Sequence, residues 1–183
     1  MRRWIGVGLA ALAAAVCTLA LPGTAVPQSP NLVVDTTADG NDGECNRDCT
    51  LREAVGLADT STGRWVQIPP GVYRLNQPLE LGNDIVFGAA FTGDFSSGAR
   101  TTVIDARGTG RAIQVAPGAS ATLAGVTVTG GSADVGAGVF VPAGSQLTLY
   151  NSIVTENVAS ARGGGIATAG NVFVYRTTVS GNR

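Results

Sequence analysis

The sequence contains no histidine and no lysine, because all twelve of its basic residues are arginine. These absences exclude a Ser-His-Asp triad, a Cys-His nucleophile pair, a histidine-ligated metal and a Schiff-base lysine. Charged residues make up only 14% of the 183 residues and the net charge is −1, so we expect no long-range attraction to nucleic acid or to an anionic membrane. Apolar residues make up 44%, which excludes a disordered chain and allows one domain with a sizeable core.

The N-terminus has the features of an export signal. A basic start, "MRRW", leads into an apolar run from Trp4 to Leu21 without a charge, and Gly23-Thr24-Ala25 forms a small-x-small cleavage site. The alternative is an uncleaved membrane anchor, since the 18 residues of this run are just enough to span a bilayer. Alanine-rich runs are weak anchors, so we predict a signal peptide over residues 1–25. The mature chain is then exported, extracellular or on the cell surface, without a membrane span.

Only three cysteines are present, and Cys17 lies within the predicted signal. The remaining pair, Cys45 and Cys49, favours a disulfide in an oxidising compartment. A zinc site is disfavoured because it needs about four ligands and no further cysteine or histidine is available. Five acidic residues surround the pair: Asp35, Asp39, Asp42, Glu44 and Asp48. They leave calcium open as a cofactor, although their spacing is not that of an EF-hand and a solvated turn is favoured. We therefore expect no metal and no other cofactor.

A short helix is predicted directly after Cys49. Thr50 and Glu53 have the spacing of a capping box, in which each side chain accepts a hydrogen bond from the other residue's backbone. Apolar residues then recur at helical spacing on one face, which must cover another part of the protein. They are Leu51, Ala54, Val55 and Ala58.

The second half of the chain repeats itself with a period of about 25 residues. The matching apolar sets are Ala121, Leu147 and Val172; Leu123, Leu149 and Val174; Val128, Val154 and Val179; and Ile113, Val139 and Ile166. Gly131 also aligns with Asn157 and Asn182. Short alternating strands at a constant period, with glycine-rich corners, are typical of stacked coils. An antiparallel sandwich would not require this repeat, so the sequence predicts an all-β parallel β-helix over residues 65–183.

The earlier coils are less regular. Strands are expected around residues 66–68, 72–75, 79–81 and 85–87, an opening strand at 31–35, and an inserted loop at 89–100. Residues 26–64 would form an N-terminal cap, because the open end of a β-helix exposes unpaired backbone. The predicted helix after Cys49 is the element that would cover it.

These residues also resemble a known bacterial family. "CTLREAV", with the preceding "VVDTTADGNDGEC", is similar to the motif of CSLREA-domain proteins, and "GGGIATAGNVFVYRTTVSGN" is similar to their coils. The resemblance implies a right-handed, pectate-lyase-like β-helix that is secreted or displayed on the surface, and it transfers no catalytic residues. Such chains are usually longer, and this one stops at "VSGNR" within a coil, so we expect it to be a fragment.

The sequence offers few candidates for a catalytic or carbohydrate site. Asp105 and Arg107 are the most suggestive pair, although a polar turn is favoured for them. Glu156 aligns with glycines in the neighbouring coils, so no acid pair of the kind a glycosidase needs is predicted. Tyr150 is a candidate for stacking on a sugar.

We expect a non-enzymatic scaffold for display, adhesion or carbohydrate contact, with carbohydrate or other cell-surface components as partners. The alternatives are a polysaccharide lyase or glycoside hydrolase with part of its site missing, and a purely structural module of a larger chain.

Overall fold

The computed structural model describes residues 31–59, 65–88 and 98–183. The predicted signal peptide and most of the expected loop at 89–100 lie outside the described residues. Nearly all of the described secondary structure is β-strand, and every pair of neighbouring strands is parallel. The predicted all-β class with parallel strands is therefore confirmed.

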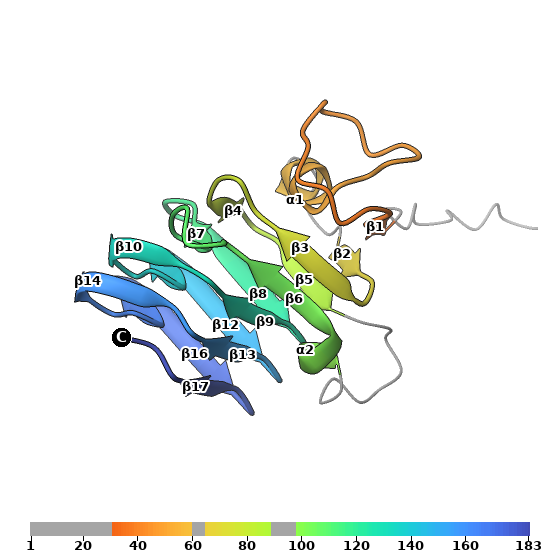
Figure 1. The fold of residues 1–183 in the computed structure, drawn as a ribbon. Coiled ribbons are helices and arrows are strands. Elements are labelled where there is room, and N and C mark those ends of the chain that lie inside the picture. Colours follow the sequence, from red (N-terminus) through yellow and green to blue (C-terminus); the bar gives the residue numbers. More distant parts are fainter. Residues whose placement is uncertain (1–30, 60–64, 89–97) are drawn as a thin grey trace, which may run out of the picture.

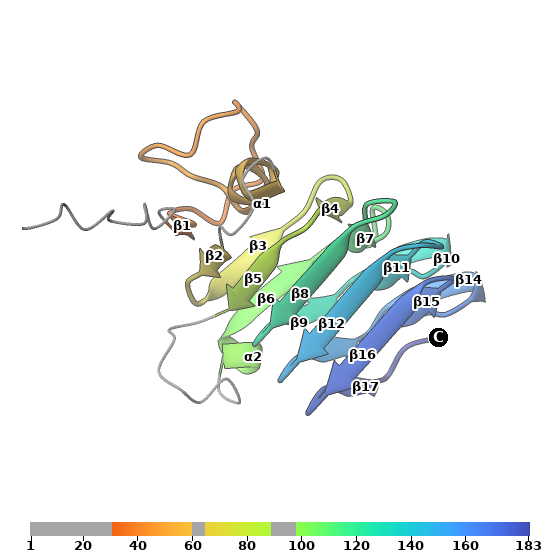
Figure 2. The same ribbon diagram turned by 180° about the vertical axis from the view of Figure 1, so that it is seen from behind.

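The strands form four sheets (Figures 1 and 2). The six-stranded sheet contains, in order, β1 (Leu32–Val33), β2 (Trp65–Ile68), β5 (Ile85–Gly88), β8 (Ser120–Ala124), β12 (Gln146–Tyr150) and β16 (Asn171–Tyr175). The five-stranded sheet contains β3 (Gly71–Arg74), β6 (Thr102–Asp105), β9 (Thr127–Thr129), β13 (Ile153–Thr155) and β17 (Thr178–Ser180). The four-stranded sheet contains β4 (Leu79–Leu81), β7 (Ile113–Val115), β11 (Val139–Val141) and β15 (Ile166–Thr168). The two-stranded sheet contains β10 (Ser132–Val135) and β14 (Val158–Arg162).

From β2 onward the chain visits the sheets in a constant cycle. Each cycle, called a coil below, passes from the six-stranded sheet to the five-stranded sheet and then to the four-stranded sheet. In two coils, β10 or β14 is added between the last two of these sheets. Figure 1 shows successive coils in order along the molecule, from yellow strands to blue ones.

The sequence repeat sets the register between coils. Leu147 of β12 pairs with Ala121 of β8 on one side and with Val172 of β16 on the other. The other predicted sets also pair as aligned, at Leu149, Val154 and Val139. The aliphatic side chains of these strands are buried in one core. In the last coil Val174 and Val179 are each 47% exposed, since no described strand lies beyond them.

Gly131 and Asn157, which align in the sequence repeat, are in direct contact in neighbouring coils. The Asn157 side chain is fully buried, and its Oδ1 accepts a hydrogen bond of 2.8 Å from Gly131 N. Its Nδ2 donates to Val128 O at 3.1 Å and to Thr155 O at 2.9 Å. Backbone groups at this corner of the coil are therefore satisfied by a side chain, as burial requires. Asn182 repeats the arrangement one coil later by donating to Val154 O.

A helix covers one end of the parallel sheets. α1 (Leu51–Asp59) lies against β1, β2 and β4, at the end opposite the blue strands in Figure 1. The predicted apolar face is confirmed, because Leu51, Ala54, Val55 and Ala58 are at most 2% exposed. No described helix has the length and apolar character required to cross a bilayer.

Some predicted elements were incomplete. The opening strand is shorter than residues 31–35, because only Leu32 and Val33 pair with β2. The last three residues of the expected loop, 98–100, belong instead to the short helix α2 (Gly98–Thr101). Strands β10 and β14 were missed because none of their residues is fully buried and the two strands pair only with each other. Hydrophobic periodicity identifies only strands with one buried face.

The ladder of paired aliphatic residues predicts a large penalty for truncation at its centre. Leu149→Ala should lower the free energy of unfolding by about 2–5 kcal/mol, because Leu149 is fully buried between Leu123 and Val174. Thr148→Ala, on the outward side of the same strand, should change it by less than about 0.5 kcal/mol. Urea unfolding followed by circular dichroism measures both. Equal effects of the two substitutions would contradict this packing.

Candidate functional site

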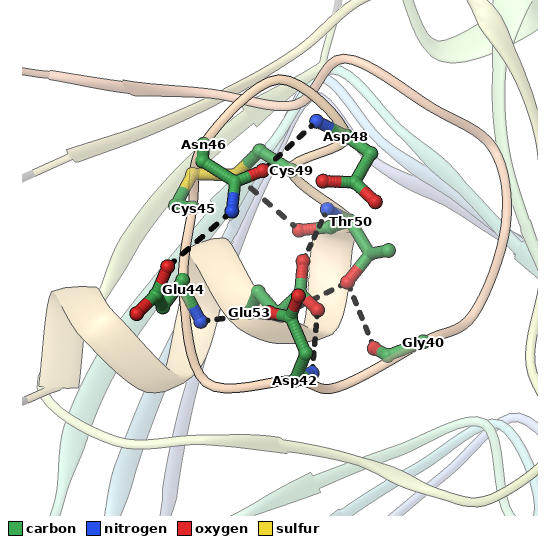
Figure 3. Close-up of a disulfide and its surroundings, with 9 residues drawn as sticks. All are labelled: Gly40, Asp42, Glu44, Cys45, Asn46, Asp48, Cys49, Thr50 and Glu53. Atoms are coloured by element: carbon green, nitrogen blue, oxygen red, sulfur yellow. Dashed lines mark hydrogen bonds between the residues drawn. A yellow bond between two sulfur atoms is a disulfide. The ribbon is translucent and has the colours of Figure 1, made fainter.

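The predicted disulfide between Cys45 and Cys49 is confirmed (Figure 3). Cys49 is fully buried in the core, and Cys45 packs against it. The bond closes a small loop immediately before α1, so it fixes the entry of the chain into the helix. Its position among core residues is that of a structural cross-link.

Thr50 and Glu53 form both hydrogen bonds of a capping box. Thr50 N donates to Glu53 Oε2 at 2.9 Å, and Glu53 N donates to Thr50 Oγ1 at 3.2 Å. The other carboxylate oxygen of Glu53 accepts a bond of 2.8 Å from Asp42 N, and Thr50 Oγ1 donates to Gly40 O at 2.9 Å. The box therefore also holds the acidic loop that precedes the disulfide (Figure 3).

Burial and hydrogen bonding act in opposite directions on the pKa of Glu53. Burial raises the pKa of this carboxyl, whereas the hydrogen bonds from Thr50 and Asp42 stabilise its charged form. The hydrogen bonds prevail, so the pKa of Glu53 is lowered below its ordinary value. The carboxylate is therefore built into the cap as an anion that accepts hydrogen bonds.

Arg52 joins the acidic loop to the first coil, a contact that the sequence alone did not reveal. Its Nε and one terminal nitrogen donate to the two oxygens of Asp39 at 2.8 and 2.9 Å. The guanidinium also donates to Gln77 O and Pro78 O, both at 2.9 Å. Asp39 Oδ2 accepts a further bond from Asn76 N at 2.6 Å. We call this arrangement the Arg52–Asp39 clasp.

The clasp borders a cavity of about 570 Å³ between the acidic loop, α1 and the turn before β4. The charges of Arg52 and Asp39 at its wall satisfy each other. Within the described ranges, no three cysteine or acidic side chains gather closely enough to hold a metal ion. The contacts of Arg52 and Asp39 therefore attach the acidic loop and α1 to the first coil.

Asp105 and Arg107 form a turn. Asp105 Oδ1 accepts a hydrogen bond of 2.8 Å from Arg107 N, and Arg107 has a left-handed backbone with φ of 55°. Glu156 also has a left-handed backbone, as do Gly130 and Gly181 at the equivalent corners. Asp105 pairs with Thr129 of β9, and β9 separates β6 from β13, so Glu156 lies two strand spacings away, roughly 10 Å. The structure does not bring the candidate acids together.

Arg111 is also engaged. Its guanidinium donates to Val135 O, Gly136 O and Gln114 Oε1 and lies 4.7 Å from the centre of the Phe140 ring. Partial burial lowers the pKa of Arg111, as desolvation does for any cation. Its donors are used to join neighbouring coils.

The six-stranded sheet carries no charged residue in any of its strands. Figure 2 is the view in which β5, β8, β12 and β16 of this sheet are most fully seen. Its outward side chains are aromatic, aliphatic, hydroxyl or amide groups: Val33, Trp65, Gln67, Ile85, Phe87, Ser120, Thr122, Gln146, Thr148, Tyr150, Asn171, Phe173 and Tyr175. We call this set the neutral face. The five-stranded sheet differs, because it contains Arg74 and Asp105.

Aromatic rings on the neutral face lie in two groups. Tyr150 and Tyr175 pair in register on adjacent strands, with ring centres 6.2 Å apart. Trp65 and Phe87 meet edge to face at 5.8 Å. Tyr175 is 50% exposed and Phe173 is 43% exposed. The structure thus places the predicted stacking residue Tyr150 in an aromatic pair, which the repeat spacing of 25 residues signals in the sequence.

Compared with protein-family models, with curated proteins and with solved structures, the chain has no match. The similarity of "CTLREAV" to CSLREA-domain proteins therefore stays a prediction.

The disulfide loop makes the stability of the cap dependent on oxidation. Cys45→Ala/Cys49→Ala should lower the free energy of unfolding by about 2 kcal/mol, the chain-entropy value for so short a loop. A reducing agent should have a similar effect on the unmodified protein and none on the variant. Denaturant unfolding with and without dithiothreitol measures this. Insensitivity of the unmodified protein would show that the cross-link is absent in solution.

The lowered pKa of Glu53 predicts a loss of stability in acid. The stabilisation is fully present above the pKa of the unfolded state, about 4.3, and is lost as the pH falls through the lower folded pKa. Glu53→Gln should be less stable at pH 7, and its stability should decline less between about pH 5 and pH 2. Thermal melts across this range measure the effect, with Glu44→Gln on the exposed part of the loop as the control. Parallel pH curves for the unmodified protein and Glu53→Gln would refute this role.

Proposed function

We propose that the protein is an exported, non-enzymatic scaffold that contacts carbohydrate through the neutral face. In this proposal the parallel sheets are the sides of a right-handed β-helix with coils of about 25 residues. The constant cycle among the sheets and the in-register pairing support the helix. The right hand rests on the general preference for right-handed parallel crossovers and on the resemblance to CSLREA-domain proteins.

Export is supported by two independent features of the chain. The Cys45–Cys49 disulfide is of a kind that persists in oxidising compartments. The basic start and apolar run of residues 1–21 have the composition of a secretory signal. Together they favour an extracellular or surface location.

A binding role is favoured over catalysis by the arrangement of the charged candidates. Asp105 is used in the turn with Arg107, and Glu156 occupies a left-handed corner whose equivalents in the neighbouring coils are Gly130 and Gly181. A glycosidase needs two carboxyl groups that face one substrate, and a polysaccharide lyase needs a base beside the bound substrate. On the five-stranded sheet Arg74 of β3 pairs in register with Asp105 of β6, but Asp105 is the only acid in the described strands of this sheet, so it has no second carboxylate to act with.

The observation that carries the proposal is the uncharged, aromatic character of the neutral face. Tyrosine and tryptophan rings present an apolar surface with a polar tip, which suits the mixed apolar and hydroxylated faces of a sugar ring. The amides and hydroxyls of Asn171, Gln146 and Thr148 lie on the same face and can exchange hydrogen bonds with sugar hydroxyls. In-register pairing repeats these groups from coil to coil, as an extended chain of sugars requires.

Binding to a panel of polysaccharides tests the proposal. The protein should retard in affinity electrophoresis with at least one polysaccharide and should release no new reducing or unsaturated ends, with or without calcium. Tyr175→Ala should weaken binding about tenfold through the loss of ring stacking, because this ring is half exposed on the neutral face. Tyr175→Phe, which keeps the ring, is the matched control and should bind nearly as well.

Two results would overturn the proposal. The release of new chain ends would show an enzyme, and binding that is unchanged in Tyr175→Ala would move the contact away from the neutral face.

A further inference from the structure

A small notch lies beside the neutral face, where the six-stranded sheet passes into the five-stranded sheet. Its volume is about 270 Å³. Asn151 and Ser152 between β12 and β13 line it, together with Arg176 between β16 and β17 and Arg100 of α2. Two neighbouring coils and α2 therefore contribute to one concave site.

The notch has a positive charge that the described residues do not neutralise. Neither Arg100 nor Arg176 forms an ion pair with a described carboxylate, in contrast to Arg52. Asp105 is the last residue of β6 and Glu156 directly follows β13, whereas the notch lies at the opposite ends of these strands. Two guanidinium groups at one cavity attract an anion and can bind a carboxylate or sulfate with paired hydrogen bonds.

The backbone does not require arginine at position 176. Arg176 has a left-handed conformation with φ of 46°, and the equivalent corners of the two preceding coils are Asn151 with φ of 46° and Gly125 with φ of 67°. Glycine and asparagine adopt this conformation most readily. The geometry of the corner therefore does not explain the guanidinium, which is exposed and lines the notch.

The aromatic pair adjoins this charge along the chain. Tyr150 directly precedes Asn151, and Tyr175 directly precedes Arg176. The two rings lie 6.2 Å apart on the neutral face, so a stacking surface borders a cationic notch. A ligand that uses both would carry an anionic group on a ring with an apolar face.

We propose that the notch binds the carboxylate or sulfate of an acidic sugar whose ring stacks at Tyr150 and Tyr175. This inference rests on the proposed carbohydrate contact and adds to it the charge of the glycan. The shared chemistry is an anionic group on a sugar ring, and carboxylated and sulfated glycans are its two sources.

Isothermal titration with matched glycans tests the inference. The probes are a neutral polysaccharide, the same backbone with carboxylated sugars, and the same backbone with sulfate esters. At low salt the unmodified protein should bind at least one acidic form at least about tenfold more tightly than the neutral form, as expected for charge-assisted hydrogen bonds. The preferred acidic form identifies the source of the anion.

Arg100→Gln/Arg176→Gln should remove this preference and leave the affinity for the neutral glycan unchanged. Arg162→Gln, on the exposed end of β14, is the control for a general change in charge and should keep the preference. Equal loss in Arg162→Gln, or a preference that survives Arg100→Gln/Arg176→Gln, would overturn the inference.

The outcomes separate this inference from the proposed function. If neutral and acidic glycans bind equally well and Tyr175→Ala still weakens the binding of both, the charged notch is overturned and the proposed function stands. The absence of binding to every glycan would overturn both proposals. Thermal melts of each variant establish that it is folded before binding is measured.

Discussion

Parallel pairing in register between successive coils is the constraint on which the rest of the structure depends. Each coil is too short to shield its own aliphatic residues, and water is excluded only when equivalent residues of the next coil lie beside them. Leu149, fully buried between Leu123 and Val174, shows this directly. A slip of one residue would turn every inward side chain outward, so the repeat length and the core determine each other.

The ends of such a stack need separate solutions, because an end coil has no neighbour on one side. At the N-terminal end α1 buries its apolar face against β1, β2 and β4. The disulfide, the capping box and the Arg52–Asp39 clasp all converge on the chain around this helix. A short helix has little stability in isolation, so these contacts supply the order that its nine residues lack.

The core fixes every second residue of a strand and leaves the outward positions free to carry other chemistry. Different sheets use this freedom differently. The six-stranded sheet is uncharged and partly aromatic, whereas Arg111, just before β7 of the four-stranded sheet, donates to the Val135 and Gly136 carbonyls of the next coil. The corners add a second set of outward residues, where left-handed backbone places Asn151 and Arg176 at the border between two sheets. Buried aliphatic side chains and more exposed polar or aromatic side chains thus alternate along the same short strands.

The sequence by itself determined the parallel strands, the register, the disulfide and the apolar face of α1, because each depends on spacing between residues of the chain. Leu147 pairs with Val172, as the repeat spacing predicts, and Cys49 forms the predicted disulfide with Cys45. Only the tertiary structure decided which polar groups meet. Arg52 binds Asp39 and the Gln77 and Pro78 carbonyls, and Arg100 of α2 lines the same cavity as Arg176 of the last coil. Such contacts join residues without a common period, so no local pattern in the chain encodes them. They form only after the coils have brought distant segments together.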